Sequence, residues 1–263
     1  MHTHLRAALL ALCIPALLPP PAPAQETGTE IRILCSNGIR GAMQKLLPEY
    51  ERTAGTRVNV QYGASAILKR SIEAGEPFDL AILTPQLIED LIKQEKIAAG
   101  TKVDIATTGI GVAVRAGSPK PDVTTPEALK QTLLKAKSIA YVQEGASTAA
   151  IVNMLDRLGI HGEIQSKIVF QPGAVPSMAS VAGGQIDVAF ALISEILPAP
   201  GVQLAGPFPP EFQRPVGMSA GIASSTKNRE AAGKIIKWLT SAEASATIKA
   251  TGLDPARAAS LRP

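Results

Sequence analysis

Four short stretches of small and polar residues stand where a strand pattern gives way to a helical pattern. They cover residues 36–38 (SNG), 63–65 (GAS), 143–148 (QEGAST) and 172–177 (PGAVPS). The first amide groups of a helix have no partner inside the helix, and they carry the positive end of its dipole. Small side chains let an anion approach these amides, and Ser or Thr adds a hydroxyl donor. The residue types and their spacing therefore indicate anion binding by neutral donors.

Each stretch also has a simpler explanation, because Ser, Thr and Asn cap ordinary helices. However, two of the four lie in the first half of the chain and two in the second. In open α/β sheets, such strand ends line a crevice at the carboxyl edge of the sheet, where ligands bind. Taken together, the four stretches predict two α/β lobes that face a polar cleft.

The elements that would position these stretches follow from the hydrophobic pattern. Strand patterns alternate with helical patterns, which predicts an α/β fold with mostly parallel sheets. Strands are expected at 31–35, 57–62, 78–83, 110–114, 138–142, 167–170, 186–192 and 216–223. The helix after the first strand places Ile39, Met43 and Leu46 on one stripe, and Pro48 is expected to bend or break it.

Two matches to hydrolase motifs lack their catalytic partners. Residues 217–221 (GMSAG) match the G-x-S-x-G turn that holds a nucleophilic serine, but no histidine follows Ser219 to act as its base. Residues 224–227 (SSTK) match S-x-x-K without the S-D-N and K-T-G motifs that accompany it. Since no nucleophile–base pair can be assembled, the sequence argues against an enzyme.

Composition excludes further classes of site. After residue 24 the chain holds one cysteine, Cys35, and one histidine, His161, which cannot supply the ligands of a zinc or copper site. Residues 109–111 (GIG) lack the third glycine of a dinucleotide fingerprint. We therefore expect no metal, because the ligands are missing, and no cofactor, because the fingerprint is incomplete. The net charge of +4 is mild and the basic residues are dispersed, which argues against a nucleic-acid partner.

The N-terminal segment has the features of a secretory signal. Arg6 precedes the apolar run 7–14, and a Pro-rich stretch ends in A-P-A at 22–24. A basic start, a short apolar core and a small-residue cleavage site predict a signal peptide over residues 1–24. The apolar run is too short to cross a bilayer.

Beyond these features, the chain resembles the type II periplasmic solute-binding proteins of ABC transporters, and most closely their molybdate-binding group. The resemblance is carried by RILCSNGIRGAMQKLLPEYERTAG, VQYGASAILKRSIEAGEPFDLAILTPQLIEDLIKQEKI, GASTAAIVNMLDRLGI and NREAAGKIIKWLTSAEA. It covers essentially the whole chain after residue 24. It implies two α/β lobes, joined by crossing strands at 107–114 and 216–223, that close on a ligand in the cleft.

The resemblance also implies the limits of the lobes and the role of the protein. Lobe 1 would comprise residues 25–108 and 216–263, and lobe 2 would comprise residues 109–215. The protein would be periplasmic, would bind a small oxyanion such as molybdate or tungstate, and would deliver it to an inner-membrane permease. We expect a monomer without enzymatic activity.

Carried over by position, the family's five ligand contacts fall on Ser36, Ser65, Ser147, Val175 and Phe190. The expected site also includes Asn37, with Arg40, Ala64 and Thr148 as further candidates beside them. The family holds its tetrahedral anion with hydroxyls and backbone amides, without a countercharge. Its fifth contact is a tyrosine hydroxyl, and Phe190 stands in that place. Asn37 and Arg40 replace apolar residues, and Glu144 would repel a dianion if it faced the cleft. These departures leave the identity of the anion open.

Other functions also remain open at this point. A receptor of the same class could bind sulfate, phosphate or an organic acid, with Arg40 supplying a charge. A secreted enzyme on a similar scaffold would need catalytic groups that the sequence does not offer. A structural or sensory protein that has lost its ligand would not need Ser36 and Ser65.

Overall fold

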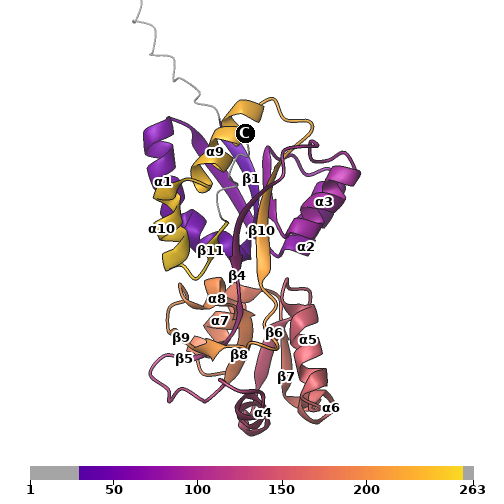
Figure 1. The fold of residues 1–263 in the computed structure, drawn as a ribbon, viewed down its shortest axis with the longest axis vertical. Coiled ribbons are helices and arrows are strands. Elements are labelled where there is room, and N and C mark those ends of the chain that lie inside the picture. The colour runs from indigo at the N-terminus through magenta and orange to yellow at the C-terminus, as the bar shows by residue number, and fades with distance from the viewer. Residues whose placement is uncertain (1–29, 257–263) are drawn as a thin grey trace, which may run out of the picture.

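A computed structural model describes residues 30–256, so the expected signal peptide and residues 257–263 lie outside the described part. The described chain forms two lobes, one above the other in Figure 1, each built on one sheet. No helix in residues 30–256 is long and apolar enough to cross a membrane.

The first lobe contains a six-stranded sheet in the order β11-β4-β10-β3-β1-β2. Its strands are β1 (Glu30–Ser36), β2 (Arg57–Gly63), β3 (Leu80–Leu83), β4 (Val103–Thr108), β10 (Val216–Ile222) and β11 (Asp254–Pro255). Its helices are the short η1 (Asn37–Ile39), α1 (Arg40–Ala54), α2 (Ser65–Glu73), α3 (Pro85–Lys93), α9 (Arg229–Leu239) and α10 (Ala242–Ala250).

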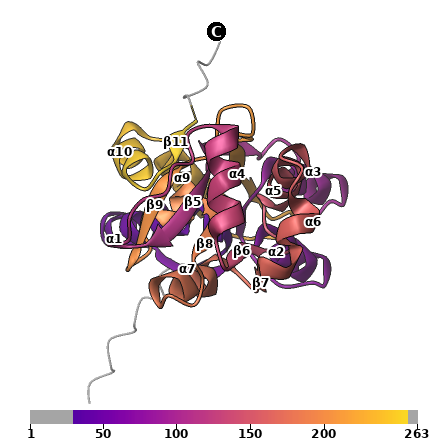
Figure 2. The same cartoon turned by 90° about the horizontal axis from the view of Figure 1, so that it is seen from below.

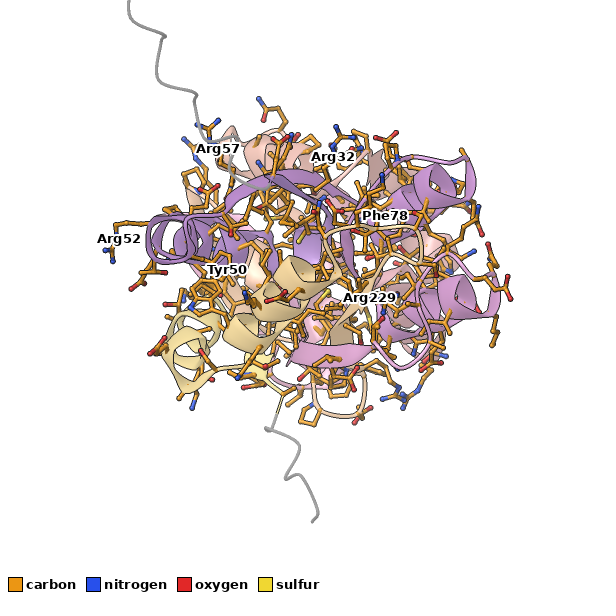
Figure 3. The ribbon with its side chains drawn as sticks, turned by 90° about the horizontal axis from the view of Figure 1, so that it is seen from above. Arg32, Tyr50, Arg52, Arg57, Phe78 and Arg229 are labelled. Carbon is orange, nitrogen blue, oxygen red and sulfur yellow. The ribbon has the colours of Figure 1, made fainter. Side chains whose placement is uncertain are left out.

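The helices of the first lobe cover both faces of its sheet. Helices α1, α9 and α10 lie on one side, and α2 and α3 lie on the other (Figure 1). The ring of Tyr50 on α1 packs against that of Trp238 on α9, with 5.0 Å between the ring centroids. Figure 3 shows Tyr50 pointing from α1 toward the C-terminal helices, whereas Arg52 points away from the body of the lobe. Apolar residues at helical spacing thus anchor these helices.

The second lobe contains a five-stranded sheet in the order β7-β6-β8-β5-β9. Its strands are β5 (Ile110–Arg115), β6 (Ile139–Val142), β7 (Ile168–Gln171), β8 (Val188–Leu192) and β9 (Val202–Pro207). Its helices are α4 (Pro126–Lys135), α5 (Thr148–Arg157), α6 (His161–Ile164), the short η2 (Gln165–Lys167), α7 (Ala174–Ala182) and α8 (Ile193–Ile196). Seen from below, α5 and α6 lie to one side of the strands and α7 lies to another (Figure 2).

Both sheets are mixed, with one parallel half and one antiparallel half. Strand β1 pairs with β2 and β3 in parallel, and β6 pairs with β7 and β8 in parallel. The strands next to the lobe junction, β4, β5, β9 and β10, pair antiparallel. The two-lobed α/β fold is as expected, and the antiparallel halves arise where the chain crosses between the sheets.

The chain passes from the first sheet to the second at Gly109 and returns over residues 208–215. The lobe limits expected at 108/109 and 215/216 stay predictions, and this exchange of sheets is consistent with them. Ser194 ties the lobes together at one point, because its hydroxyl donates to the carbonyl oxygen of Gly38 at 2.7 Å.

Helix α1 corrects part of one expectation, because Pro48 lies inside it without breaking it, while a bend at Pro48 stays a prediction. Proline removes one intrahelical hydrogen bond and normally disrupts a helix interior. Here the residues around it are fixed by tertiary packing, since Leu46, Leu47 and Tyr50 are buried in the core. Packing of the apolar face keeps the helix continuous over Arg40–Ala54.

Candidate ligand-binding site between the lobes

A small cavity lies where the carboxyl ends of strands from both lobes meet. Its volume is about 30 Å³, measured as the space open to the centre of a water-sized sphere. That is room for roughly two water molecules. The first lobe contributes Ser36, Asn37, Ala64 and Ser65, and the second contributes Val142, Gly145, Ala146, Ser147, Gly173, Ala174, Ser177, Phe190, Ala191, Leu192 and Glu195.

The structure brings most of the expected site residues together at this cavity, which we call the central cavity. Six of them line it: Ser36, Asn37, Ala64, Ser65, Ser147 and Phe190. The other three do not. Val175 and Arg40 line a neighbouring groove, and the Thr148 hydroxyl is engaged locally with Gly145 N at 2.9 Å and Val142 O at 2.7 Å. Whether these residues bind a ligand remains a prediction.

Helix starts surround the central cavity, as the four sequence stretches suggested. Ser36 caps η1, and its Oγ accepts a hydrogen bond from Gly38 N at 3.3 Å. Ser65 is the first residue of α2, and Ser147 is the N-cap of α5 without a capping side-chain bond. Gly173 is the N-cap of α7 and likewise makes no capping side-chain bond. The free amides of these first turns give the cavity a positive potential without any basic side chain.

Two hydroxyls in the cavity wall lack hydrogen-bond partners. The Oγ atoms of Ser65 and Ser177 are both fully buried, and neither has a partner among the described residues. An unsatisfied buried hydroxyl costs about 1–3 kcal/mol, so such groups in a folded protein call for an explanation. Both residues border the central cavity, and they come from different lobes. A ligand with acceptor atoms would satisfy both.

Ser177 ends the fourth stretch singled out in the sequence, but it was left out of the expected contacts because the family position there fell on Val175. On α7, however, Val175 is 52% exposed, whereas Ser177 is 1% exposed. The buried residues Ala174, Ser177, Met178 and Val181 follow the i, i+3, i+4, i+7 spacing of one helix face. That spacing was visible in the sequence and would have selected Ser177.

Glu195 is the second residue that sequence reasoning missed. It begins no recognisable motif, and the acidic residue expected near the site was Glu144. The backbone N–H of Leu192 donates to Glu195 Oε2 at 3.2 Å. Part of the residue's surface borders the cleft, but protein atoms crowd the carboxyl, and this burial raises its pKa to about 7 against the opposing effect of the Leu192 N–H.

Glu144 instead lies in a wider hollow beside the central cavity. Its carboxylate forms an ion pair with Arg70 of the first lobe at 2.7 Å. The hollow measures about 520 Å³ and shares Ser65, Gly145 and Ala146 with the central cavity. The expected repulsion between Glu144 and a bound anion is therefore weakened by a cationic partner.

The groove on the other side has about 270 Å³ and shares Asn37, Ala174 and Glu195 with the central cavity. Its wall includes Arg40, whose guanidinium lies 5.0 Å from the centre of the Tyr62 ring. Arg40 thus borders the groove rather than the central cavity.

Phe190 closes one wall of the central cavity and supplies no hydrogen bond. Its ring is 1% exposed and meets Phe208 edge to face at a centroid distance of 5.3 Å. Tyr141 lies further away, at 6.5 Å. The described residues also contain no group of three or more metal-ligating side chains.

The family model of the bacterial extracellular solute-binding proteins matches residues 31–254 of the sequence. The chain belongs to this family. The resemblance seen in the sequence is thereby confirmed, and the two-lobed fold accords with it.

The names of individual relatives indicate different functions, an isomerase and a molybdate-binding protein. Aconitate isomerase of Pseudomonas sp is 29% identical over 251 residues, which is 94% of this chain and 95% of that protein. The molybdate-binding protein of Azotobacter vinelandii is 25% identical over 232 residues, 85% of this chain and 89% of that protein. A solved structure, the periplasmic molybdate-binding protein of Azotobacter vinelandii, superposes with a TM-score of 0.74 at 21% identity, covering 86% of this chain and 100% of that one. This structural likeness supports the fold alone.

Proposed function

We propose that this protein is a periplasmic receptor that binds a small oxyanion in the central cavity and delivers it to the permease of an ABC transporter. The observation that carries the proposal is the pair of unsatisfied hydroxyls, Ser65 and Ser177, which border the cavity from opposite lobes. A ligand that accepts hydrogen bonds from both would stabilise the closed arrangement of the lobes.

The walls suit an anion held by neutral donors. Ser36, Ser65 and Ser177 border the space together with the first residues of η1 and α2. Hydrogen bonds to a charged acceptor are worth about 1.5–3 kcal/mol each, so a few of them suffice for tight binding. The family membership and the molybdate-binding relatives support the same class of ligand.

Molybdate and tungstate head the candidates, with sulfate, phosphate and small carboxylates behind them. Phe190 removes one donor that the resemblance implies, and Glu195 adds an acidic group to the wall. Both changes weaken the case for a fully ionised dianion and leave the neutral-donor design in place.

A thermal-shift screen of the purified protein tests the proposal directly. A ligand that binds only the folded state raises the melting temperature by mass action, so at least one of these anions should produce a dose-dependent rise. Titration calorimetry then gives the affinity. An unchanged melting temperature with every anion, together with no heat of binding at pH 6, would refute the proposed receptor function.

A second candidate function is isomerisation of an unsaturated polycarboxylate, and Glu195 is the observation that favours it. A carboxyl with a pKa of about 7 at a cavity can both take and return a proton near neutral pH. The aconitate isomerase relative, which matches 94% of this chain, supports this reading. One carboxylate would occupy the central cavity while the rest of the molecule extends into the hollow of about 520 Å³.

The chemistry of such a step balances without a cofactor. Glu195 would remove a proton from a methylene carbon next to a carbon–carbon double bond, the double bond would shift by one carbon, and the proton would return to the former vinyl carbon. Proton NMR in D₂O with cis-aconitate tests it. Conversion to the trans isomer, or deuterium entering the methylene group, supports the isomerase when Glu195→Gln abolishes it. Unchanged acid after prolonged incubation with active receptor protein contradicts it.

A further inference from the structure

We propose that Glu195 couples anion binding to proton uptake, so that the central cavity holds a fully ionised oxyanion only together with one proton. This inference rests on the proposed receptor function and assigns a specificity-determining role to a residue outside the expected site.

Glu195 is the one ionisable residue among the fifteen described residues that line the central cavity. The others are Ser, Asn, Gly, Ala, Val, Leu and Phe. Its carboxyl accepts one hydrogen bond, from Leu192 N at 3.2 Å, and it pairs with no cation in residues 30–256. An anion in this cavity therefore meets the carboxyl without an intervening countercharge.

The elements packed around α8 bring little charge toward Glu195. Arg40, at the start of α1, lines the neighbouring groove together with Glu195, but its guanidinium is placed over the Tyr62 ring. Helix α7, η1 and strands β8 and β9 carry no ionisable side chain. On β5 the single charged residue is Arg115, at the end that pairs with Val202.

The physical consequence is a choice between two states of the carboxyl. An ionised Glu195 repels the anion in a space from which most water is excluded, whereas a protonated Glu195 can donate an O–H to it. Burial already raises the pKa of the empty site to about 7, and a bound anion raises it further. An anion that carries its own proton, such as hydrogen phosphate, could instead donate to the ionised carboxyl.

Linkage gives a quantitative expectation. Below a pH of about 7 the carboxyl is already protonated, so affinity for a permanently ionised anion should be nearly constant. Above about pH 7 each binding event must take up one proton, and the affinity should fall about tenfold per pH unit.

The test is titration calorimetry with sodium molybdate and, separately, sodium sulfate between pH 6 and 8.5. At pH 8 the heats in buffers of different ionisation enthalpy should report uptake of about one proton per anion. Glu195→Gln keeps the shape and an acceptor for Leu192 N–H, and it should bind with a flat pH profile and no proton uptake. Glu144→Gln, an acidic residue of the adjacent hollow, should keep the wild-type slope.

The outcomes separate this inference from the proposed function. Binding at pH 6 with a flat wild-type profile and no proton uptake would overturn the role of Glu195 and leave the receptor standing. An equally steep slope in Glu195→Gln would also overturn it. Absence of binding by any anion at pH 6 would overturn the receptor itself. If Glu195→Gln fails to fold, the proton count of the wild-type protein still decides.

Discussion

Ser65 and Ser177 border one small cavity from opposite lobes, and the hydroxyl oxygen of neither has a hydrogen-bond partner in the described chain. Residues that serve only to cap helices would place their oxygens on backbone amides, as Ser36 does with Gly38 N. These two hydroxyls instead carry an energetic penalty that a ligand can relieve. A binding role and a capping role of these serines can therefore be distinguished by measuring ligand affinity and stability separately.

Replacing Ser177 by alanine should weaken anion binding and leave the folded protein no less stable. Loss of one hydrogen bond to a charged acceptor corresponds to about 10- to 150-fold in affinity. Because the hydroxyl is unsatisfied, its removal should leave the free energy of unfolding unchanged or raise it by about 1 kcal/mol. Calorimetry and urea unfolding measure the two quantities. Ser180→Ala on the same helix, whose exposed hydroxyl donates to Pro176 O, is the control and should bind normally.

Phe190→Tyr tests the identity of the anion. A tyrosine hydroxyl would restore the fifth donor that the family resemblance implies, and it should tighten molybdate binding by up to about tenfold. Tyrosine has the same ring, so the edge-to-face contact with Phe208 can be kept. Relative affinities for molybdate, sulfate and a small carboxylate give the answer. Weaker molybdate binding with unchanged carboxylate binding would point to an organic ligand.

Gly38 lies where the two lobes approach each other, and a side chain there should disturb that approach. A Cβ at this position would overlap the Met218 methyl group and lie 2.9 Å from Leu192 Cδ1. Both atoms are the ends of flexible side chains, so the cost should lie at the lower end of overpacking, about 1 kcal/mol, and Gly38→Ala should lower the free energy of unfolding by that amount and weaken binding. Gly233→Ala on helix α9, where a Cβ meets nothing within 4 Å, should instead be neutral or stabilising. Equal stability of the two variants would show that the contact yields easily.

The Arg70–Glu144 ion pair joins the lobes at the edge of the cleft and should slow ligand release. Both side chains are more than half exposed, so the effect should be small, at most about fivefold in the dissociation rate. It should vanish at high salt because exposed charges are screened. Stopped-flow measurements of Arg70→Ala at two ionic strengths check this. Lys93→Ala, which removes an exposed pair within the first lobe, should change nothing.

Stability without ligand should depend on pH through Glu195. Its folded pKa of about 7 lies above the ordinary value of 4.5, so the folded state binds this proton more tightly than the unfolded state. The free energy of unfolding contributed by this group is therefore greatest below pH 4.5 and declines as the pH rises toward 7. The difference in stability between wild type and Glu195→Gln should follow that decline. A constant difference from pH 4.5 to 8 would contradict it.

Local patterns in the sequence predicted the two-lobed fold, and six of the expected site residues line the central cavity, although their role in binding stays a prediction. Small residues after a strand, as at Ser36 and Ser65, mark helix starts, and parallel strands bring those starts to one edge. The sequence could not reveal Glu195, because its role comes from α8 folding back beside the cavity. It also could not show that Pro48 leaves α1 unbroken, since tertiary packing overrides a local preference that is worth only a few kcal/mol.

The position of β10 in the sheet has a consequence for the order in which the chain folds. Strand β10 lies between β3 and β4, yet it is separated from both in sequence by the whole second lobe. The first sheet therefore stays divided into two unpaired parts until the segment after residue 215 is available. The second lobe, whose strands all fall within Ile110–Pro207, has no such dependence. We therefore expect the second lobe to fold first as the chain is synthesised or exported. Until then, the N-terminal part of the first lobe would remain partly unfolded, a state in which it is easily translocated.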